Sequence, residues 1–107
     1  MKAPARASRI RLLVLDVDGV LTDGGLVYGP SGEETKRFYV RDGLAIQAAR
    51  LAGIEVAIVS GRASAAVPQR CADLGITEIL QGVADKTAAF NILIARLGIA
   101  ASACACV

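Results

Sequence analysis

The 107-residue sequence contains no histidine, and this absence removes several classes of enzyme at once. It excludes histidine nucleophiles, Ser-His-Asp triads and zinc sites with histidine ligands. The three cysteines are an odd number, which argues against a disulfide framework, and the lone C-x-C at Cys104 and Cys106 does not complete a metal site. A cysteine phosphatase needs an arginine six residues after its nucleophile, but Thr77 stands six residues after Cys71.

Aromatic residues make up only 4% of the chain, so the core has to be built from Ala, Val, Leu and Ile. This composition favours a buried sheet covered by Ala-rich helices. No apolar run is long enough to span a membrane, and the run after the basic N-terminal residues is too short for a signal peptide. The net charge is only +2, so neither nucleic acid nor a membrane is an expected partner. We expect a cytoplasmic protein with a disordered basic tail at residues 1–8 and one domain at residues 9–107.

Strand-like and helix-like patterns alternate along the chain. Strands are expected at residues 10–15, 55–59, 78–80 and 103–107, with a β-hairpin formed by residues 26–28 and 35–40. Helices are expected at residues 42–52, 63–74 and 85–97, the first capped by Asp42 and the second carrying Pro68 in its first turn. The apolar face of the first helix is expected to consist of Leu44, Ala45, Ala48, Ala49 and Ala52. This order predicts an α/β fold with a Rossmann-like parallel sheet and flanking helices.

Polar residues follow each predicted strand, and ligands bind beyond the carboxyl ends of strands in such sheets. Asp16 and Asp18 follow the first strand, Ser60, Gly61 and Arg62 follow the second, and the segment from residue 81 to Lys86 follows the third. These groups are expected to converge at one edge of the sheet. The convergence predicts a site that binds an anion and performs carboxylate chemistry.

Phosphoryl transfer fits these residue types. The carboxylate of Asp16 can attack phosphorus, and Asp18 can protonate the leaving oxygen and later deprotonate water. Asp16 can also bind Mg²⁺, which takes oxygen ligands and neutralises phosphate charge. The Ser60 hydroxyl and the Lys86 ammonium can hold phosphoryl oxygens, and Gly61 lets backbone N–H groups approach the anion.

Three sequence motifs resemble those of the haloacid dehalogenase superfamily. "LDVDGVLTDG" resembles its first motif, D-x-D-G; "IVSGR" resembles its second, with Ser60 in the Ser/Thr position; and Lys86 in "QGVADK" resembles its third. The wider stretch "GEETKRFYVRDGLAIQAARLAGIEVAIVSGR" is similar to phosphatases of 3-deoxy-D-manno-octulosonate 8-phosphate, which act in lipopolysaccharide biosynthesis, and to the related nonulosonate 9-phosphate phosphatases.

The resemblance implies roles for individual residues. Asp16 is then the nucleophile and an Mg²⁺ ligand, Asp18 is the acid/base and a second ligand through its carbonyl, and Ser60 and Lys86 hold the phosphate. Further residues match positions that contact the substrate: Asp18, Tyr39, Val40, Arg41, Asp42, Gly43, Gly61, Arg62, Arg70 and Lys86. Gln47 stands where some relatives carry a basic residue. The resemblance also implies the absence of a large cap domain, and a homotetramer in which the hairpin of one subunit closes the site of its neighbour.

The family has a fourth motif, G-D-D-x-x-D, which supplies further metal-binding acids after a strand. The tail "LGIAASACACV" matches the run into that strand and stops at Val107. We therefore expect a chain that is truncated before the fourth motif, with impaired hydrolysis of a sugar-acid phosphate. A non-catalytic remnant, which only oligomerises or binds phosphate weakly, is the alternative from a different class.

Simpler interpretations exist for single residues. An EF-hand is excluded because its twelfth loop position is Val27 rather than glutamate. Ser60 is also suited to capping the helix that follows it, and Lys86 to pairing with Asp85. Arg41 and Arg70 are long basic residues of the kind that usually face water.

Overall fold

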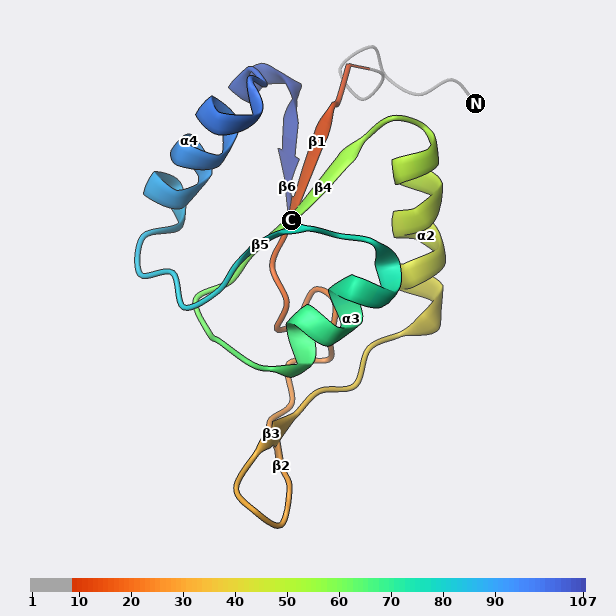
Figure 1. Cartoon of the computed structure of the whole chain (residues 1–107), viewed down its shortest axis with the longest axis vertical. Helices are drawn as coiled ribbons and strands as arrows, with labels where there is room; N and C mark the ends of the chain where they lie inside the picture. Colours follow the sequence, from red (N-terminus) through yellow and green to blue (C-terminus); the bar gives the residue numbers. More distant parts are fainter. Residues whose placement is uncertain (1–8) are drawn as a thin grey trace.

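A four-stranded parallel sheet lies between helices in the computed structural model, which describes residues 9–107 (Figure 1). The strand order is β5-β4-β1-β6, and every neighbouring pair is parallel. The strands are β1 (Leu12–Leu15), β4 (Glu55–Val59), β5 (Glu78–Leu80) and β6 (Cys104–Cys106). The predicted α/β fold is therefore confirmed, while the tail predicted at residues 1–8 lies outside the described residues.

Alternate side chains of the central strands enter two separate cores, one on each face of the sheet. Val56 and Ile58 of β4 pack with side chains from α2 (Val40–Leu51) and α3 (Ala66–Leu74). Ala57 and Val59 pack instead against α4 (Lys86–Leu97). Because both faces are covered, these strands are apolar throughout, as expected for a parallel sheet. Figure 1 shows α4 on one side of the sheet and α2 and α3 on the other.

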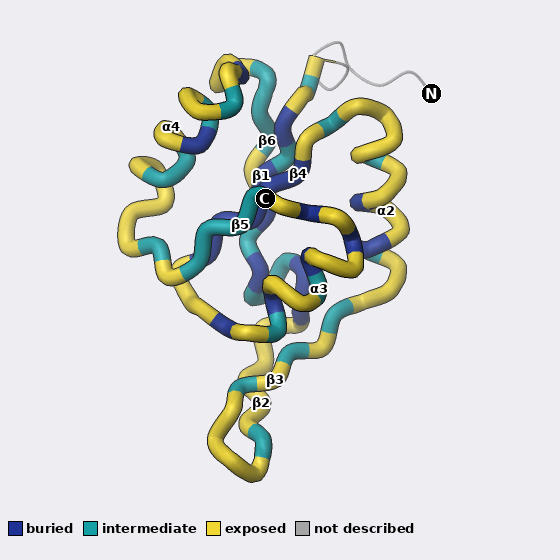
Figure 2. Tube along the Cα trace, in the orientation of Figure 1, coloured by how far each residue is buried: buried dark blue, intermediate teal, exposed yellow. Residues whose placement is uncertain are grey.

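The β-hairpin leaves the body at the carboxyl ends of the strands (Figure 1). It consists of β2 (Val27–Tyr28) and β3 (Glu34–Thr35), which pair antiparallel. The second strand is shorter than predicted, since residues 36–39 run as irregular chain toward α2. The side chains of Val27 and Tyr28 are exposed, and Figure 2 shows most of the hairpin in the colour of exposed residues.

The first long helix differs from its prediction in its start and in its buried face. Tyr39 is the N-cap of α2 and provides no side-chain cap, so the prediction that Asp42 caps the helix is wrong; Asp42 lies in the first turn. Gly43 and Ile46 are the buried residues of α2, while Leu44 is 66% exposed. The predicted apolar face is therefore wrong too. Helix α3 begins three residues later than predicted and keeps Pro68 in its first turn.

Glycines end two of the helices. Gly75 follows α3 with φ 72° and Gly98 follows α4 with φ 67°. Both values lie in the left-handed region, which glycine enters without a steric penalty. A short 3₁₀ turn, Ala101–Ala103, then leads into β6. None of the helices in residues 9–107 combines the length and the apolar character needed to cross a membrane.

Candidate active site

Asp16 stands directly beyond the carboxyl end of β1, a central strand paired on both sides. Its backbone N–H donates to the carbonyl of Val107 over 3.0 Å, which continues the ladder between β1 and β6. One side-chain oxygen, Oδ1, accepts a hydrogen bond from the backbone N–H of Val17 over 2.7 Å. The carboxylate is thus held in a defined place on a rigid part of the sheet.

Lys86, the first residue of α4, supplies the cation for this carboxylate. Its Nζ lies 2.6 Å from Oδ2 of Asp16, although the two residues are 70 positions apart in the sequence. The neighbouring Asp85 is the N-cap of α4, and its side chain accepts a hydrogen bond from the N–H of Ala88 over 3.0 Å. The helix cap and the ion pair therefore use different acids, and the simpler pairing of Lys86 with Asp85 is not observed.

The surroundings of Asp16 keep it ionised. Burial by itself raises the pKa of its carboxyl group. The pKa nevertheless lies below the ordinary value of 3.8, because it is lowered by hydrogen bonds from Lys86, the Val17 N–H and Ser60 and by the charge of Lys86. At neutral pH the side chain is therefore a carboxylate, the form that a nucleophile requires.

Ser60 lies at the carboxyl end of β4 and is only 2% exposed. Its backbone is fixed to the neighbouring strand, since its N–H donates to the carbonyl of Leu80 over 2.8 Å and its carbonyl accepts from Val83 over 3.0 Å. It does not cap α3, because the hydroxyl of Ser64 accepts the hydrogen bond from Ala66 at that helix start. The buried hydroxyl of Ser60 accepts a hydrogen bond from the backbone N–H of Arg62 over 3.4 Å, and it contributes to the lowered pKa of Asp16.

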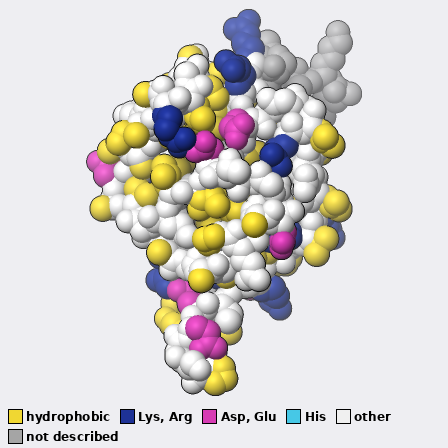
Figure 3. All heavy atoms as spheres, in the orientation of Figure 1, with side chains coloured by type: hydrophobic (Ala, Val, Ile, Leu, Met, Phe, Trp, Pro, Cys, Tyr) yellow, Lys and Arg dark blue, Asp and Glu magenta, His cyan; other side chains and the backbone are white. Residues whose placement is uncertain are grey.

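Asp18 belongs to a second group of charges beside the first. Its Oδ1 lies 2.6 Å from Nζ of Lys36, and its Oδ2 lies 3.7 Å from Nε of Arg62. Glu34 bridges the same two cations, with 3.0 Å from Oε1 to Lys36 and 3.0 Å from Oε2 to Arg62. These bonds from Lys36 and then Arg62 lower the pKa of Glu34. Figure 3 shows basic and acidic side chains next to one another where the hairpin joins the body.

Glu34 and Lys36 were missed by sequence reasoning. A signal was present, because alternate residues of a strand point to the same face, so Glu34 and Lys36 in "EETKRF" share one side of the chain. Nothing local indicated that this side faces Asp18, which is 18 positions from Lys36.

The other residues predicted to contact substrate lie where α2 meets α3. The guanidinium of Arg70 donates to the carbonyl of Tyr39 over 3.4 Å and covers Gly43, where an added Cβ would lie 2.5 Å from Nη2 of Arg70. Val40, Arg41 and Asp42 form the first turn of the same helix. Within residues 9–107, no hydrogen bond or ion pair connects residues 39–43 or Arg70 to the carboxylates of Asp16 and Asp18. Gly61, by contrast, lies between Ser60 and Arg62 beside the charged groups.

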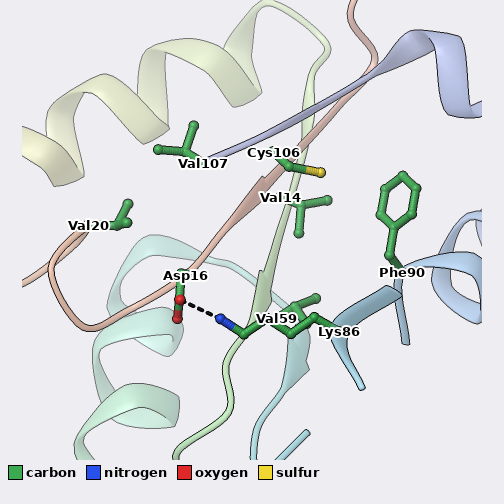
Figure 4. A pocket seen from close by; sticks show the side chains of 8 residues that line it. All are labelled: Val14, Asp16, Val20, Val59, Lys86, Phe90, Cys106 and Val107. Carbon is green, nitrogen blue, oxygen red and sulfur yellow. Dashed lines mark hydrogen bonds and ion pairs between the residues drawn. The ribbon is translucent and has the colours of Figure 1, made fainter. Parts of the chain in front are cut away.

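A hollow of about 260 Å³ opens beside Asp16 and Lys86 (Figure 4). Its other lining residues are apolar or carry a thiol: Val14, Val20, Val59, Phe90, Cys106 and Val107. Figure 4 shows the Asp16–Lys86 ion pair at one side of this hollow. The charged pair therefore faces a partly apolar space large enough to admit a small group.

The donor set suits a hard cation that takes oxygen ligands. Asp16 and Asp18 offer oxygens two residues apart, and their side chains are 30% and 24% exposed, so a cation can reach both. Among the described residues, no group of three or more His, Cys, Asp or Glu side chains is placed to hold a metal ion.

Comparison with known proteins found close relatives. The chain is 53% identical over 96 residues to 3-deoxy-D-manno-octulosonate 8-phosphate phosphatase of Escherichia coli (strain K12), an alignment covering 90% of this chain and 51% of that protein. A crystal structure of the phosphatase of the same name from Moraxella catarrhalis contains a magnesium ion, a phosphate ion and a KDO molecule. It matches this chain with a TM-score of 0.91 and 48% identity, and the match covers 94% of this chain and 58% of that one.

A putative HAD superfamily (subfamily III A) hydrolase from Legionella pneumophila matches with a TM-score of 0.90 and 40% identity, covering 94% of this chain and 56% of that chain. No family model matches the sequence. The chain spans about half the length of the curated relatives it matches.

Proposed function

The chain belongs to the haloacid dehalogenase superfamily of phosphatases, and from this premise we propose that its site hydrolyses 3-deoxy-D-manno-octulosonate 8-phosphate to the free sugar acid and phosphate. The observation that carries the proposal is the ionised Asp16 at the end of β1, 2.6 Å from Lys86, with the acid Asp18 two residues further along. Residues 9–107 are then part of one phosphatase domain.

In the first step, an oxygen of Asp16 attacks phosphorus, and the bond between phosphorus and the sugar oxygen breaks. Asp18 gives its proton to that leaving oxygen, so the sugar acid departs as an alcohol. The product on the enzyme is an aspartyl-phosphate. Lys86 and Ser60 are assigned to hold the non-reacting phosphoryl oxygens. Lys86 supports this because it donates to the attacking carboxylate over 2.6 Å, and Ser60 because it contributes to the lowered pKa of that carboxyl group.

In the second step, Asp18 takes a proton from water, and the water oxygen attacks phosphorus. The bond from phosphorus to Asp16 breaks, which releases phosphate and restores both side chains. Asp18 has to change its protonation state in each step, so the orientation of its carboxyl group matters twice in the cycle.

Mg²⁺ fits the donor set and is proposed as the cofactor, held by the carboxylate of Asp16 and the backbone carbonyl of Asp18. When bound, it supplies positive charge that offsets the charge of the phosphoryl group. Two protein ligands are few for Mg²⁺, which prefers six oxygens in near-octahedral order. We propose that a further acidic ligand comes from outside residues 9–107, as the greater length of the relatives allows.

Recognition of the sugar acid is assigned to Arg62 and to the group formed by Tyr39, Val40, Arg41, Asp42, Gly43 and Arg70. A guanidinium can pair with a substrate carboxylate through two hydrogen bonds. Since α2 and the hairpin both present exposed apolar side chains, we also propose a homotetramer in which subunits complete one another's sites.

The test is an assay of the purified chain with 3-deoxy-D-manno-octulosonate 8-phosphate, a nonulosonate 9-phosphate and p-nitrophenyl phosphate, each with Mg²⁺ and with EDTA. We expect the octulosonate ester to have the highest kcat/KM and EDTA to abolish its turnover. The 107-residue polypeptide should be slower than the E. coli enzyme by about 10²- to 10³-fold, because residues 9–107 offer the proposed Mg²⁺ only two protein ligands. Turnover that is unchanged by EDTA, or a preference for the nonulosonate ester, would contradict the proposal.

A further inference from the structure

Lys36 is nearly removed from solvent, with only 2% of its side chain exposed. Lysine is rarely buried to this degree unless it is paired, because its ammonium loses hydration. Here the ammonium lies 2.6 Å from Asp18 and 3.0 Å from Glu34, and these two bonds outweigh burial, so that the pKa of Lys36 is raised. The buried cation is therefore compensated by carboxylates from two separate segments.

We propose that Lys36 is a positioning residue for Asp18, and that through it the hairpin sets the orientation of the group that protonates the leaving oxygen. This inference rests on the proposed function, in which Asp18 is the acid/base. Lys36 itself does not touch the reacting atoms; it acts on the carboxyl group that does.

The geometry explains why the orientation of Asp18 depends on Lys36. One oxygen of Asp18 faces Lys36 at 2.6 Å, and the other faces Arg62 at the longer distance of 3.7 Å. Lys36 is thus the close partner, and Arg62, which is 47% exposed, is the loose one. If the Lys36 ammonium were removed, the carboxyl group of Asp18 would be held only by the longer contact and could rotate about its side-chain bonds.

Glu34 holds Lys36 in turn. It lies two residues before Lys36 on the same side of the chain, and it also contacts Arg62 at 3.0 Å. Four side chains form a closed ring of ion pairs in which acidic and basic residues alternate: Asp18, Lys36, Glu34 and Arg62. Glu34 belongs to the hairpin and Lys36 follows directly after it, while Asp18 and Arg62 lie in the loops beyond β1 and β4. A displacement of the hairpin would therefore be transmitted to Asp18.

The first arm of the test compares substrates that differ in their leaving groups. The sugar alcohol released from 3-deoxy-D-manno-octulosonate 8-phosphate needs a proton, whereas the phenolate released from p-nitrophenyl phosphate leaves without one. In Lys36→Met, kcat/KM, which reports the steps up to formation of the aspartyl-phosphate and not its hydrolysis, should fall about 100-fold for the sugar ester, as expected for a misplaced catalytic group. For the aryl ester kcat/KM should change only about threefold or less. Lys36→Arg keeps the charge and should recover most of the loss.

The matched control is Arg37→Met, which removes the adjacent cation. Arg37 is 78% exposed, and within residues 9–107 its one ion pair is with the exposed Asp23, at 3.3 Å, so its loss should leave both kcat/KM values unchanged. An equal fall in kcat/KM for both esters in Lys36→Met would mean that Lys36 supports the fold or the phosphate site, and it would overturn the inference.

The second arm does not require turnover. In the 107-residue chain, amide hydrogen exchange in residues 26–36 should become about tenfold faster in Lys36→Met and stay unchanged in Arg37→Met. Unchanged exchange in Lys36→Met would refute the role of Lys36 in holding the hairpin. If the unmodified protein hydrolysed neither ester, the proposed function would have failed, and this exchange measurement would still decide whether Lys36 fixes the hairpin to Asp18.

Discussion

Replacing Asp16 by asparagine separates the chemical role of this residue from its structural one. The amide is nearly isosteric with the carboxylate, and its oxygen can still accept the hydrogen bond that the Val17 N–H now gives over 2.7 Å. It cannot carry the negative charge needed for attack on phosphorus. We expect Asp16→Asn to lower kcat by at least about 10⁴-fold, in the range seen when an enzyme loses its nucleophile.

The structural cost of the same change should be small. The ion pair with Lys86 is short, at 2.6 Å, but the two side chains are 30% and 52% exposed, so solvent screens much of the attraction. A pair of this kind contributes about 1 kcal/mol or less to the free energy of unfolding. For a domain of this size, that corresponds to a fall in Tm of no more than about 8 °C.

The pH dependence gives an additional check. The pKa of Asp16 is lowered in the folded chain, so its contribution to stability is present above the ordinary value of 3.8 and is lost as the pH falls through the lowered folded pKa. The unfolding free energies of the original chain and of Asp16→Asn should therefore differ at pH 7 and converge in strong acid. Thermal unfolding by circular dichroism and a phosphate-release assay measure the two effects. A kcat within tenfold of the original value, or a stability gap that widens toward acid, would refute this reasoning.

Two further substitutions test the recognition group and the packing of α2. Arg62→Ala should raise KM for the sugar-acid phosphate by about 10- to 100-fold, because a charge-assisted hydrogen bond to the substrate is lost. KM for p-nitrophenyl phosphate should rise much less. Equal increases in the two KM values would assign Arg62 to the phosphate or the fold. Gly43→Val should lower the free energy of unfolding by about 1–3 kcal/mol, because an added Cβ meets Arg70 at 2.5 Å and the buried Leu74 at 3.0 Å. Thermal unfolding measures this effect, and an unchanged Tm would show that α2 and α3 are not packed this closely.

The buried face of α2 illustrates a limit of sequence reasoning. Apolar and small residues occur on both sides of this helix, so the helical period alone did not distinguish the face carrying Leu44 and Ala48 from the face carrying Gly43 and Ile46. The structure buries the second, because Gly43 leaves room for Arg70 and Leu74 of α3. Close approach of two helices is a property of the pair, and neither helix alone contains it.

For the charged groups too, the sequence predicted one part of the arrangement and the tertiary structure decided the other. The sequence by itself determined that Asp16, Asp18, Ser60 and Lys86 follow strands or begin a helix, and parallel strands bring their carboxyl ends to one edge. That rule was sufficient to predict that these groups converge; the 2.6 Å pair between Asp16 and Lys86, residues 70 positions apart, is where two of them meet. Only the tertiary structure decided that Glu34 and Lys36 join Asp18 and Arg62, because a hairpin can leave the body in many directions. Its docking depends on long side chains whose partners come from distant segments, and no local pattern encodes such a pairing.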